Sequence, residues 1–373
     1  MKTMVNPSAD RLGNNAVRVR ARWLPLLGLL ALAAGAHSAA LVVGYTNALA
    51  VANYSQAQMN EIGQLKWYFA HASVGGNMMS GVTGLRSSNS GFYQYQSATE
   101  DGTPPAATLT GTIYEHNRGN PGWQAKVDGF QTCASNGWRF PMVNLAVNKF
   151  CYIDQEASLD YYLGSMTNLE AAFPETVFVY MTIPLMTSQD SDNYLRNVFN
   201  DNLRAWIAAS GRVLFDIADI EAHDTNGALC TYTYNSRLCQ RLYSGYSSDG
   251  GHLNTAGSQL VAKGYYALGA ALMAADRDSD GLRDGHELIA GTRPTEARSG
   301  LQFLQPTLAV SNTVVLQWPS ASNRLYSVQR STSLAPDSFT AIVSNAPATP
   351  PWNTCTDAPP AAGSVFYRLS VKQ

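Results

Sequence analysis

The strongest constraint on this chain is an alternation of short, continuously apolar segments with longer segments of helical periodicity. The apolar segments have the length and the β-branched and aromatic content of buried strands, and they cover 65–70, 140–147, 176–184 and 212–219. The helical patterns cover 74–85, 156–173, 193–209 and 255–275. Parallel strands are apolar on both faces because crossover helices cover both sides of their sheet. The alternation therefore predicts a three-layer α/β/α domain with a parallel sheet.

A long polar, glycine-rich segment, residues 87–136, interrupts this alternation. Its composition predicts a loop. Long loops at the carboxyl ends of parallel strands usually form ligand-binding clefts. We therefore expect residues 87–136 to form part of a cleft.

The N-terminal residues have the features of an export signal. Arg18, Arg20 and Arg22 precede an apolar run at 23–36, and small residues follow at 36–40. The run is short for a bilayer span. It predicts a signal peptide over residues 1–40, with a mature chain that begins near Ala39 or Leu41 and is secreted, periplasmic or cell-surface. An uncleaved anchor is the alternative, and no transmembrane segment is expected after cleavage.

Composition and cysteine content agree with that compartment. Only 14% of the residues are charged and the net charge is −2, so neither a nucleic acid nor an anionic membrane is expected as a partner. The five cysteines are compatible with an oxidising environment. We expect two disulfides, Cys230–Cys239 and Cys133–Cys151, which would leave Cys355 unpaired.

Three residues suggest nucleophilic catalysis. Ser73 follows the first apolar segment, whereas Asp249 and His252 lie three residues apart in Ser-Asp-Gly-Gly-His-Leu-Asn, just before the last helical pattern. A serine hydroxyl needs a neighbouring base to take its proton, and that base works best when a carboxylate fixes its tautomer. These residues therefore predict a Ser73–His252–Asp249 triad. The alternatives are that Ser73 and Asp249 only cap helices and that His252 packs beneath one.

Residues 60–275 resemble the SGNH (GDSL-like) hydrolases. Asp249-Gly250-Gly251-His252 matches their D-x-x-H motif, and the nucleophile follows the first strand as in that family. Here His71-Ala72-Ser73-Val74-Gly75 replaces the family's Gly-Asp-Ser, as in a divergent H-x-S-V-G branch. The resemblance implies a serine esterase. No G-x-S-x-G elbow is present, which argues against an α/β-hydrolase.

The resemblance also implies an oxyanion hole made of a glycine N–H, an asparagine side chain and the N–H of Ser73. Gly119 or Gly122 would supply the glycine N–H. Asn148 would supply the side chain, with Asn77 as the second candidate. His71 either contacts substrate or is a half-buried, hydrogen-bonded histidine. No grouping of cysteine and histidine indicates zinc.

Residues 276–287 match the twelve-residue calcium-loop pattern at every ligand position. Such a cluster of carboxylates would be repulsive without a cation, although a solvated acidic turn is the alternative. We expect a structural calcium ion in a linker over 276–300, of the dockerin or thrombospondin-repeat sort. The expected ligands are Asp276, Asp278, Asp280, the carbonyl of Leu282, Asp284 and Glu287.

The last segment, residues 301–373, contains short alternating strands separated by turn residues, which predict a small β-sandwich. It resembles fibronectin type III-like domains, chiefly at Trp318 and Tyr367-Arg368. Such a domain could contact carbohydrate or a cell surface.

Two functions of different classes follow from these residues. The first is a secreted serine hydrolase that cleaves carboxylic esters, acting on small esters or acylated glycans and needing no cofactor for catalysis. The second is a catalytically degenerate carbohydrate-binding or surface-adhesion protein. A fluorophosphonate probe distinguishes them, because it reacts with an activated serine and not with a capping one.

Overall fold

The computed structural model describes residues 17–18, 39–99, 109–135, 143–304, 307–309, 313–360 and 364–373. The chain divides into two compact units, one over 27–300 and one over 301–372 together with 1–26, while Gln373 groups with the first. Of the predicted signal peptide, only Val17–Arg18 (β1) and residues 39–40 are described, so that prediction lies almost entirely outside the described residues.

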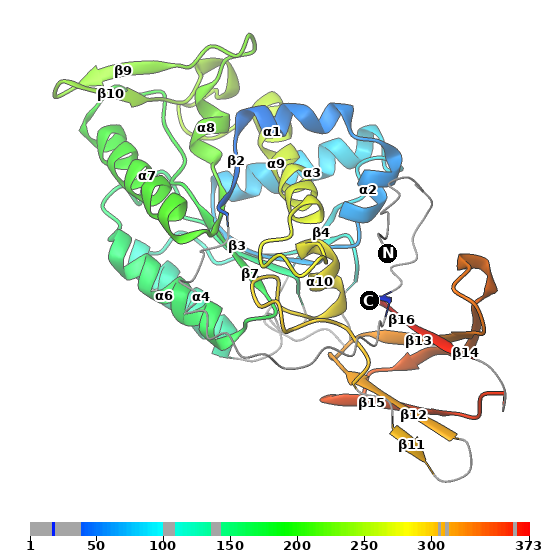
Figure 1. Ribbon diagram of the computed structural model, residues 1–373. Helices are drawn as coiled ribbons and strands as arrows, with labels where there is room; N and C mark the ends of the chain where they lie inside the picture. The colour runs from blue at the N-terminus through cyan, green and yellow to red at the C-terminus, as the bar shows by residue number, and fades with distance from the viewer. Residues whose placement is uncertain are drawn as a thin grey trace, which may run out of the picture. The chain divides into compact units, whose positions relative to one another are not determined.

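The larger unit is built on a seven-stranded parallel sheet in the order β2-β8-β7-β6-β3-β5-β4 (Figure 1). Every residue of the four central strands is buried, as their apolar sequences predict. The strands are β2 (Leu41–Val43), β3 (Trp67–His71), β4 (Gln96–Thr99), β5 (Thr112–Asn117), β6 (Leu145–Asn148), β7 (Val177–Met181) and β8 (Val213–Phe215).

Helices cover both faces of the sheet, which confirms the predicted three-layer α/β/α architecture (Figure 1). Trp67 and Phe69 belong to the apolar core on one face, and Tyr68 and Ala70 belong to the core on the other. The first face is covered by α1 (Tyr45–Ala50), α2 (Gln56–Ile62), α3 (Val74–Ser88), α8 (Ile217–Ala222), α9 (Thr255–Ala274) and α10 (Asp284–Ala290). The second is covered by α4 (Trp123–Ser135), α6 (Leu159–Ala172) and α7 (Ser191–Ser210).

The prediction of a loop over 87–136 was wrong for much of that segment. It contains β4, β5 and the whole of α4. The two strands lie at an edge of the sheet, where β4 is half-buried or exposed and only the first three residues of β5 are buried. Edge strands lack the continuous apolar sequence of central ones, so the pattern that identifies β3 or β7 is missing here.

A two-stranded hairpin of β9 (Thr231–Tyr234) and β10 (Arg237–Gln240) follows α8. Its register places Cys239 opposite Tyr232, and the neighbouring Arg241 N–H donates to the carbonyl of Cys230. The two cysteines are therefore not directly opposite each other. Both are free thiols, as are Cys133, Cys151 and Cys355, so the two expected disulfides are absent.

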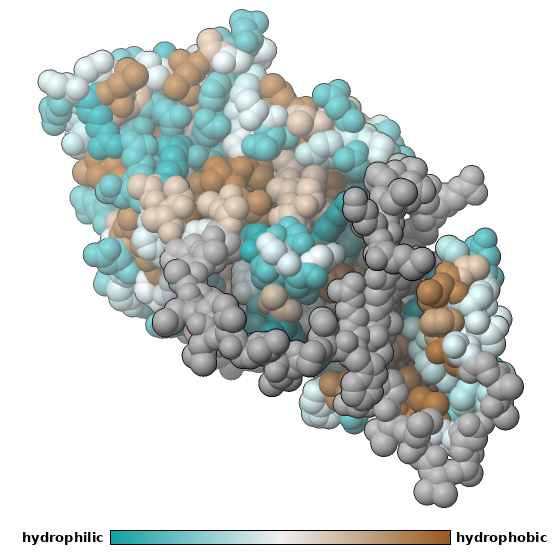
Figure 2. Space-filling view, in the orientation of Figure 1, coloured by the Kyte–Doolittle hydropathy of each residue, from teal (hydrophilic) through white to brown (hydrophobic). Residues whose placement is uncertain are grey.

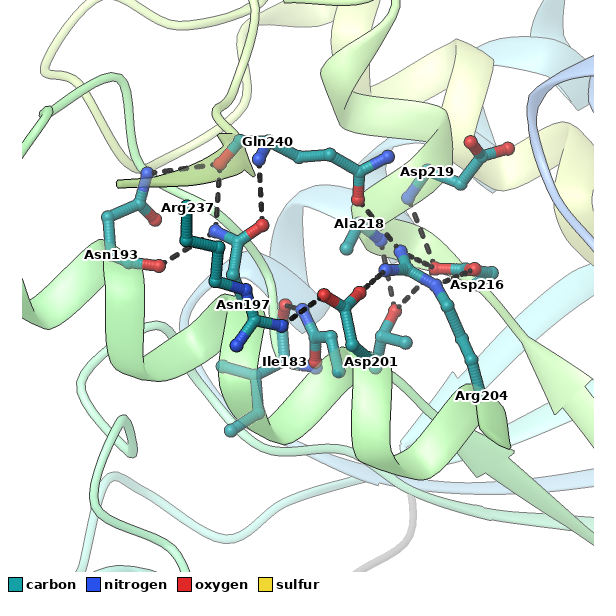
Figure 3. Close-up of polar contacts among 12 residues, drawn as sticks. Ile183, Asn193, Asn197, Asp201, Arg204, Asp216, Ala218, Asp219, Arg237 and Gln240 are labelled. Atoms are coloured by element: carbon teal, nitrogen blue, oxygen red, sulfur yellow. Dashed lines mark hydrogen bonds and ion pairs between the residues drawn. The ribbon is translucent and has the colours of Figure 1, made fainter. Parts of the chain in front are cut away.

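A polar network joins this hairpin to α7 and to the end of β8 (Figure 3). The guanidinium of Arg204 on α7 donates to both carboxylate oxygens of Asp216, at 2.6 and 2.8 Å. It also donates to Asp201 at 2.8 Å and to the side chain of Gln240 on β10 at 2.9 Å. Asp216 in turn caps α8 by accepting from the N–H of Asp219. One arginine thus connects three elements.

The smaller unit contains two antiparallel sheets, β1-β16-β13-β14 and β11-β12-β15. The ring of Trp318 on β12 packs edge-on against Tyr326 on β13, with centroids 5.9 Å apart, so the two sheets share one core as a β-sandwich does. The remaining strand bounds are β11 (Thr307–Ala309), β12 (Thr313–Pro319), β13 (Leu325–Ser331), β14 (Thr340–Pro347), β15 (Trp352–Asp357) and β16 (Phe366–Lys372).

Figure 2 shows hydrophilic residues over much of the described surface in that view, with smaller apolar areas between them. Within the described ranges, none of the helices has both the length and the apolar character that a bilayer crossing requires.

Candidate active site

Ser73 lies in the tight connection between β3, which ends at His71, and α3, which begins at Val74. Its backbone has φ 53° and ψ −113°, a conformation that residues other than glycine rarely adopt. Such strain is concentrated at functional sites. The Ser73 side chain makes no capping hydrogen bond to α3, so the helix-cap alternative for this residue was wrong.

The structure brings the three predicted triad residues together across a separation of 179 positions. Ser73 Oγ lies 2.6 Å from His252 Nε2, and His252 Nδ1 lies 2.7 Å from Asp249 Oδ2. Hydrogen bonds hold the pKa of Asp249 well below its usual range. The largest contribution comes from the N–H of Gly251, followed by the side chain and the N–H of His252. The ionised carboxylate accepts from Nδ1–H, which leaves Nε2 free to accept the serine proton.

Hydrogen bonds within the turn that carries Asp249 and His252 fix its shape. Asp249 Oδ1 accepts from the N–H of Gly251 at 3.0 Å and from that of His252 at 2.8 Å. The hydroxyl of Ser247 donates to the carbonyl of His252 at 2.6 Å. Asn254 caps α9, so Asp249 is not needed as the cap of that helix. The turn therefore presents His252 from a rigid frame.

Asn77, the second candidate for the oxyanion hole, also holds this turn. Its Oδ1 accepts from the N–H of Leu253 at 3.1 Å, which ties the first turn of α3 to the residue after His252. The contact links the helix that follows Ser73 to the turn that carries His252. We therefore assign Asn77 a positioning role.

Asn148 lies at the end of β6, where the strand register pairs it with Ala70 on β3. It is 1% exposed, and its Oδ1 accepts from Arg118 Nη1 at 2.7 Å. Its Nδ2 is buried and has no hydrogen-bond partner among the described residues. A buried amide donor without a partner is unfavourable unless a ligand supplies an acceptor.

Gly119 lies just beyond β5, in a loop joined to β3 by a hydrogen bond from the Arg118 N–H to the carbonyl of His71. It has φ 70° and is exposed, and its N–H donates to Asn117 Oδ1 at 3.3 Å. Gly122, the other candidate, is exposed at the beginning of α4. The structure thus places Gly119 at the carboxyl edge of the sheet, beside the end of β3.

His71 is buried rather than half-buried, with 1% exposure, and it stacks on Phe69. Its Nε2 lies 3.1 Å from Glu115 Oε2 on the neighbouring strand. Burial lowers the pKa of His71 despite that carboxylate. Of the two roles predicted for His71, the structure supports the buried, hydrogen-bonded one.

Tyr152 is a residue that sequence reasoning missed. Its hydroxyl lies 3.4 Å from Nδ1 and 3.5 Å from Nε2 of His252, and the two rings are nearly perpendicular. Tyr152 belongs to the irregular segment after β6, where neither periodicity nor a motif distinguishes it. The only signal in the sequence is that Tyr152 follows β6, whose carboxyl end lies at the same edge of the sheet as the end of β3.

The predicted calcium loop follows α9 directly and leads into α10. Carboxylate oxygens of Asp276, Asp278 and Asp280 lie within 4.8 Å of one another. Glu287 is fully buried, and its Oε2 has no hydrogen-bond partner among the described residues. Burial and the nearby aspartates raise the pKa of Glu287 to about 9. These groups fit a cation that would satisfy the orphaned oxygens.

Two features of this loop differ from the sequence prediction. Asp284, expected at the ninth ligand position, is buried in an ion pair with Arg277. In addition, residues 276–300 belong to the larger compact unit instead of forming a separate linker. The side chain of Asn144, just before β6, donates to the carbonyl of Leu288 on α10 at 2.8 Å, which fastens this segment to the sheet.

Comparison with known proteins adds little to this geometry. No protein-family model and no curated protein matches the chain. A GDSL-like lipase from Bacteroides thetaiotaomicron has 12% identity and a TM-score of 0.32, covering 60% of this chain and 92% of its own. A candidate acylhydrolase from Bacteroides fragilis has 12% identity and a TM-score of 0.34, covering 55% of this chain and 90% of its own. At these scores the likeness carries no weight for activity.

Proposed function

We propose that this protein is a serine hydrolase that cleaves carboxylic esters. The observation that carries the proposal is the continuous chain of contacts from Ser73 Oγ through His252 to Asp249, at 2.6 and 2.7 Å. These distances are those at which a base can take a proton from a nucleophile while a carboxylate orients that base. The strained backbone of Ser73 is consistent with a residue held for reaction.

In the proposed reaction, Ser73 Oγ attacks the acyl carbon and its proton passes to His252 Nε2. The carbonyl oxygen becomes an oxyanion, for which the N–H of Ser73, the N–H of Gly119 and Asn148 Nδ2 are the proposed donors. Collapse of this adduct breaks the ester C–O bond, and the leaving oxygen takes the proton from Nε2. Water, deprotonated by His252, then releases the acyl group from Ser73.

The triad can be tested on the nucleophile itself. Ser73→Ala should lower hydrolysis of p-nitrophenyl acetate by on the order of 10⁴-fold or more, because the attacking atom is gone. A fluorophosphonate probe should label the wild-type protein at the peptide that contains Ser73. Circular dichroism of the variant controls for folding. Unchanged turnover in the folded variant would refute the assignment.

The rival function is a degenerate binding protein for carbohydrate or a cell surface. It is favoured by the replacement of the SGNH Gly-Asp-Ser motif with His71-Ala72-Ser73. On that hypothesis the wild-type protein neither hydrolyses esters nor reacts with the probe. The labelling experiment therefore decides between the two.

Membership of a divergent SGNH branch, export from the cell and action on acylated glycans are further parts of the proposal. The D-x-x-H turn and the position of Ser73 after β3 support the family. The basic and apolar N-terminal sequence supports export. Acylated glycans follow from the family and the expected location, and screening of acetylated polysaccharides against simple esters would test that substrate class.

We further propose that residues 276–287 bind a structural calcium ion. Asp276, Asp278, Asp280 and Glu287 would supply carboxylate oxygens, and Leu282 its carbonyl. Asp284 would instead hold the loop through Arg277. The support is the cluster of three aspartates together with the buried, unpaired oxygen of Glu287.

A further inference from the structure

We propose that Tyr152 is a catalytic residue whose hydroxyl donates a hydrogen bond to the leaving-group oxygen of the ester as its C–O bond breaks. The inference rests on the proposed ester hydrolysis and assigns a group to one step of it. It starts from the position of the Tyr152 hydroxyl, 3.5 Å from His252 Nε2 and beside the Ser73 side chain.

This hydroxyl interacts with the Ser73 side chain and has only long contacts with His252, so a ligand oxygen can compete for its hydrogen bond. The hydroxyl is nearly equidistant from the two ring nitrogen atoms of His252, at 3.4 and 3.5 Å, and a single O–H cannot donate well to both. Both distances are at the long limit for a hydrogen bond. The phenol is half-buried, and burial raises its pKa, so the O–H keeps its proton at neutral pH.

The position of the Tyr152 hydroxyl beside His252 Nε2 indicates the reaction step in which it acts, the departure of the leaving group. In the acylation reaction the leaving oxygen must come within hydrogen-bond reach of Nε2, because it takes its proton from that atom. Two groups about 3.5 Å apart can both contact one oxygen placed between them, each at a normal hydrogen-bond distance. As the C–O bond breaks, its electron pair moves to the leaving oxygen. Tyr152 would stabilise that charge while keeping its own proton.

Tyr152 is held firmly from both sides. Its carbonyl accepts from Arg196 Nε at 2.5 Å, and Arg196 is buried. The preceding N–H, of Cys151, donates to Asp154 at 2.7 Å, and that carboxylate is paired with buried Lys126. A donor fixed in this way does not need to reorganise as charge develops.

The ring of Tyr152 also packs against the turn that carries Asp249 and His252. A Cβ atom on Gly251 would lie 2.9 Å from Tyr152 Cε1 and 3.1 Å from Cζ. Glycine at this position therefore allows the phenol to approach His252. The close contact makes the hydroxyl part of the same rigid assembly as the base.

The test compares Tyr152→Phe with wild type on a series of aryl and alkyl acetates whose leaving groups become progressively more basic. We expect kcat/KM to fall little for p-nitrophenyl acetate and about 10- to 100-fold for alkyl acetates, because a basic leaving oxygen needs the hydrogen bond most. The plot of kcat/KM against leaving-group pKa should therefore be steeper in the variant. Tyr161→Phe removes an exposed hydroxyl that bonds to Asp128 and serves as the matched control, with no change of slope.

Each outcome has a distinct meaning. An equal loss on all esters, with an unchanged slope, would overturn the inference and indicate an oxyanion or structural role for Tyr152. No loss on any ester would also overturn it. A wild-type protein that neither turns over esters nor reacts with a fluorophosphonate would instead refute the proposed function itself.

Discussion

Gly75 and Gly76 are neighbours in the first turn of α3, but their surroundings differ at the scale of a single methyl group. A Cβ atom on Gly75 would lie 2.4 Å from Cβ and 2.6 Å from Cγ of His71, whereas one on Gly76 would meet nothing within 4 Å. His71 is buried and cannot move aside easily. The buried histidine thus requires a glycine at position 75.

Gly75→Ala should consequently destabilise the fold by about 1–3 kcal/mol through overpacking. Gly76→Ala is the matched control and should be neutral or stabilising by up to about 1 kcal/mol, because alanine favours helix and the site has room. Urea denaturation followed by circular dichroism measures both. Equal effects of the two substitutions would show that helix propensity, and not the His71 contact, governs this turn.

The convergence of Ser73, His252 and Asp249 could be predicted from a motif that encodes chemistry, whereas their catalytic roles stay a prediction. Contacts that depend only on position in the fold could not be predicted. Ser73, Asp249 and His252 could be identified because a serine, a base and an orienting carboxylate have a recognisable spacing. Tyr152 could not, because its relation to His252 arises from the way the segment after β6 folds back. The ion pair of Asp284 with Arg277 is likewise invisible in the pattern of aspartates.

At the scale of elements, Arg204 links α7, the end of β8 and β10 through one side chain (Figure 3). Arg204→Ala would leave the carboxylate of Asp216, which is 4% exposed, without its charged partner. Removal of one partner of a buried ion pair typically costs about 3 kcal/mol or more. We expect a loss of that order in the free energy of unfolding, measured by urea denaturation.

Arg293 provides the comparison for Arg204. It pairs with Glu175 and Glu296, and all three side chains are at least 40% exposed. Exposed ion pairs contribute less than about 1 kcal/mol, so Arg293→Ala should be nearly neutral. Losses of similar size in the two variants would contradict the role assigned to burial.

The strands that are fully buried were predicted from the sequence, whereas those that are only partly buried were not. β3, β6, β7 and β8 are wholly buried, and each lies within a segment that the sequence identified or extends one residue beyond it. The edge strand β4 and its neighbour β5 were missed because they mix polar and apolar residues and are only partly buried. The short β2 gives too few residues for a pattern, although it pairs in parallel with β8.

At the scale of the whole molecule, the acidic loop is integral to the larger unit. It begins where α9 ends, and α9 packs in the core beside α3, the helix that follows the nucleophile. Gly285 on α10 has no room for a side chain because Met273 of α9 lies against it. An ion that orders this loop should therefore stabilise the larger unit as a whole.

Calcium in the millimolar range should raise the melting temperature relative to a chelator. A ligand at 100 times its Kd adds about 2.7 kcal/mol of stability. Glu287→Gln should abolish most of the increase, whereas Asp337→Asn, at an exposed position in the smaller unit, should leave it intact. Differential scanning calorimetry measures the shift. No calcium-dependent shift in the wild-type protein would refute the site.

The distance in sequence between Ser73 and His252 has a consequence for the synthesis and refolding of the protein. The Ser73 hydroxyl is translated 179 residues before the His252 imidazole, its proposed base. The edge strand β2 is likewise translated long before β8, the strand with which it pairs. A nascent chain that stops short of His252 lacks the proposed base. During refolding, recovered turnover would report when the turn that carries His252 docks beside Ser73, well after the earliest helical signal has returned.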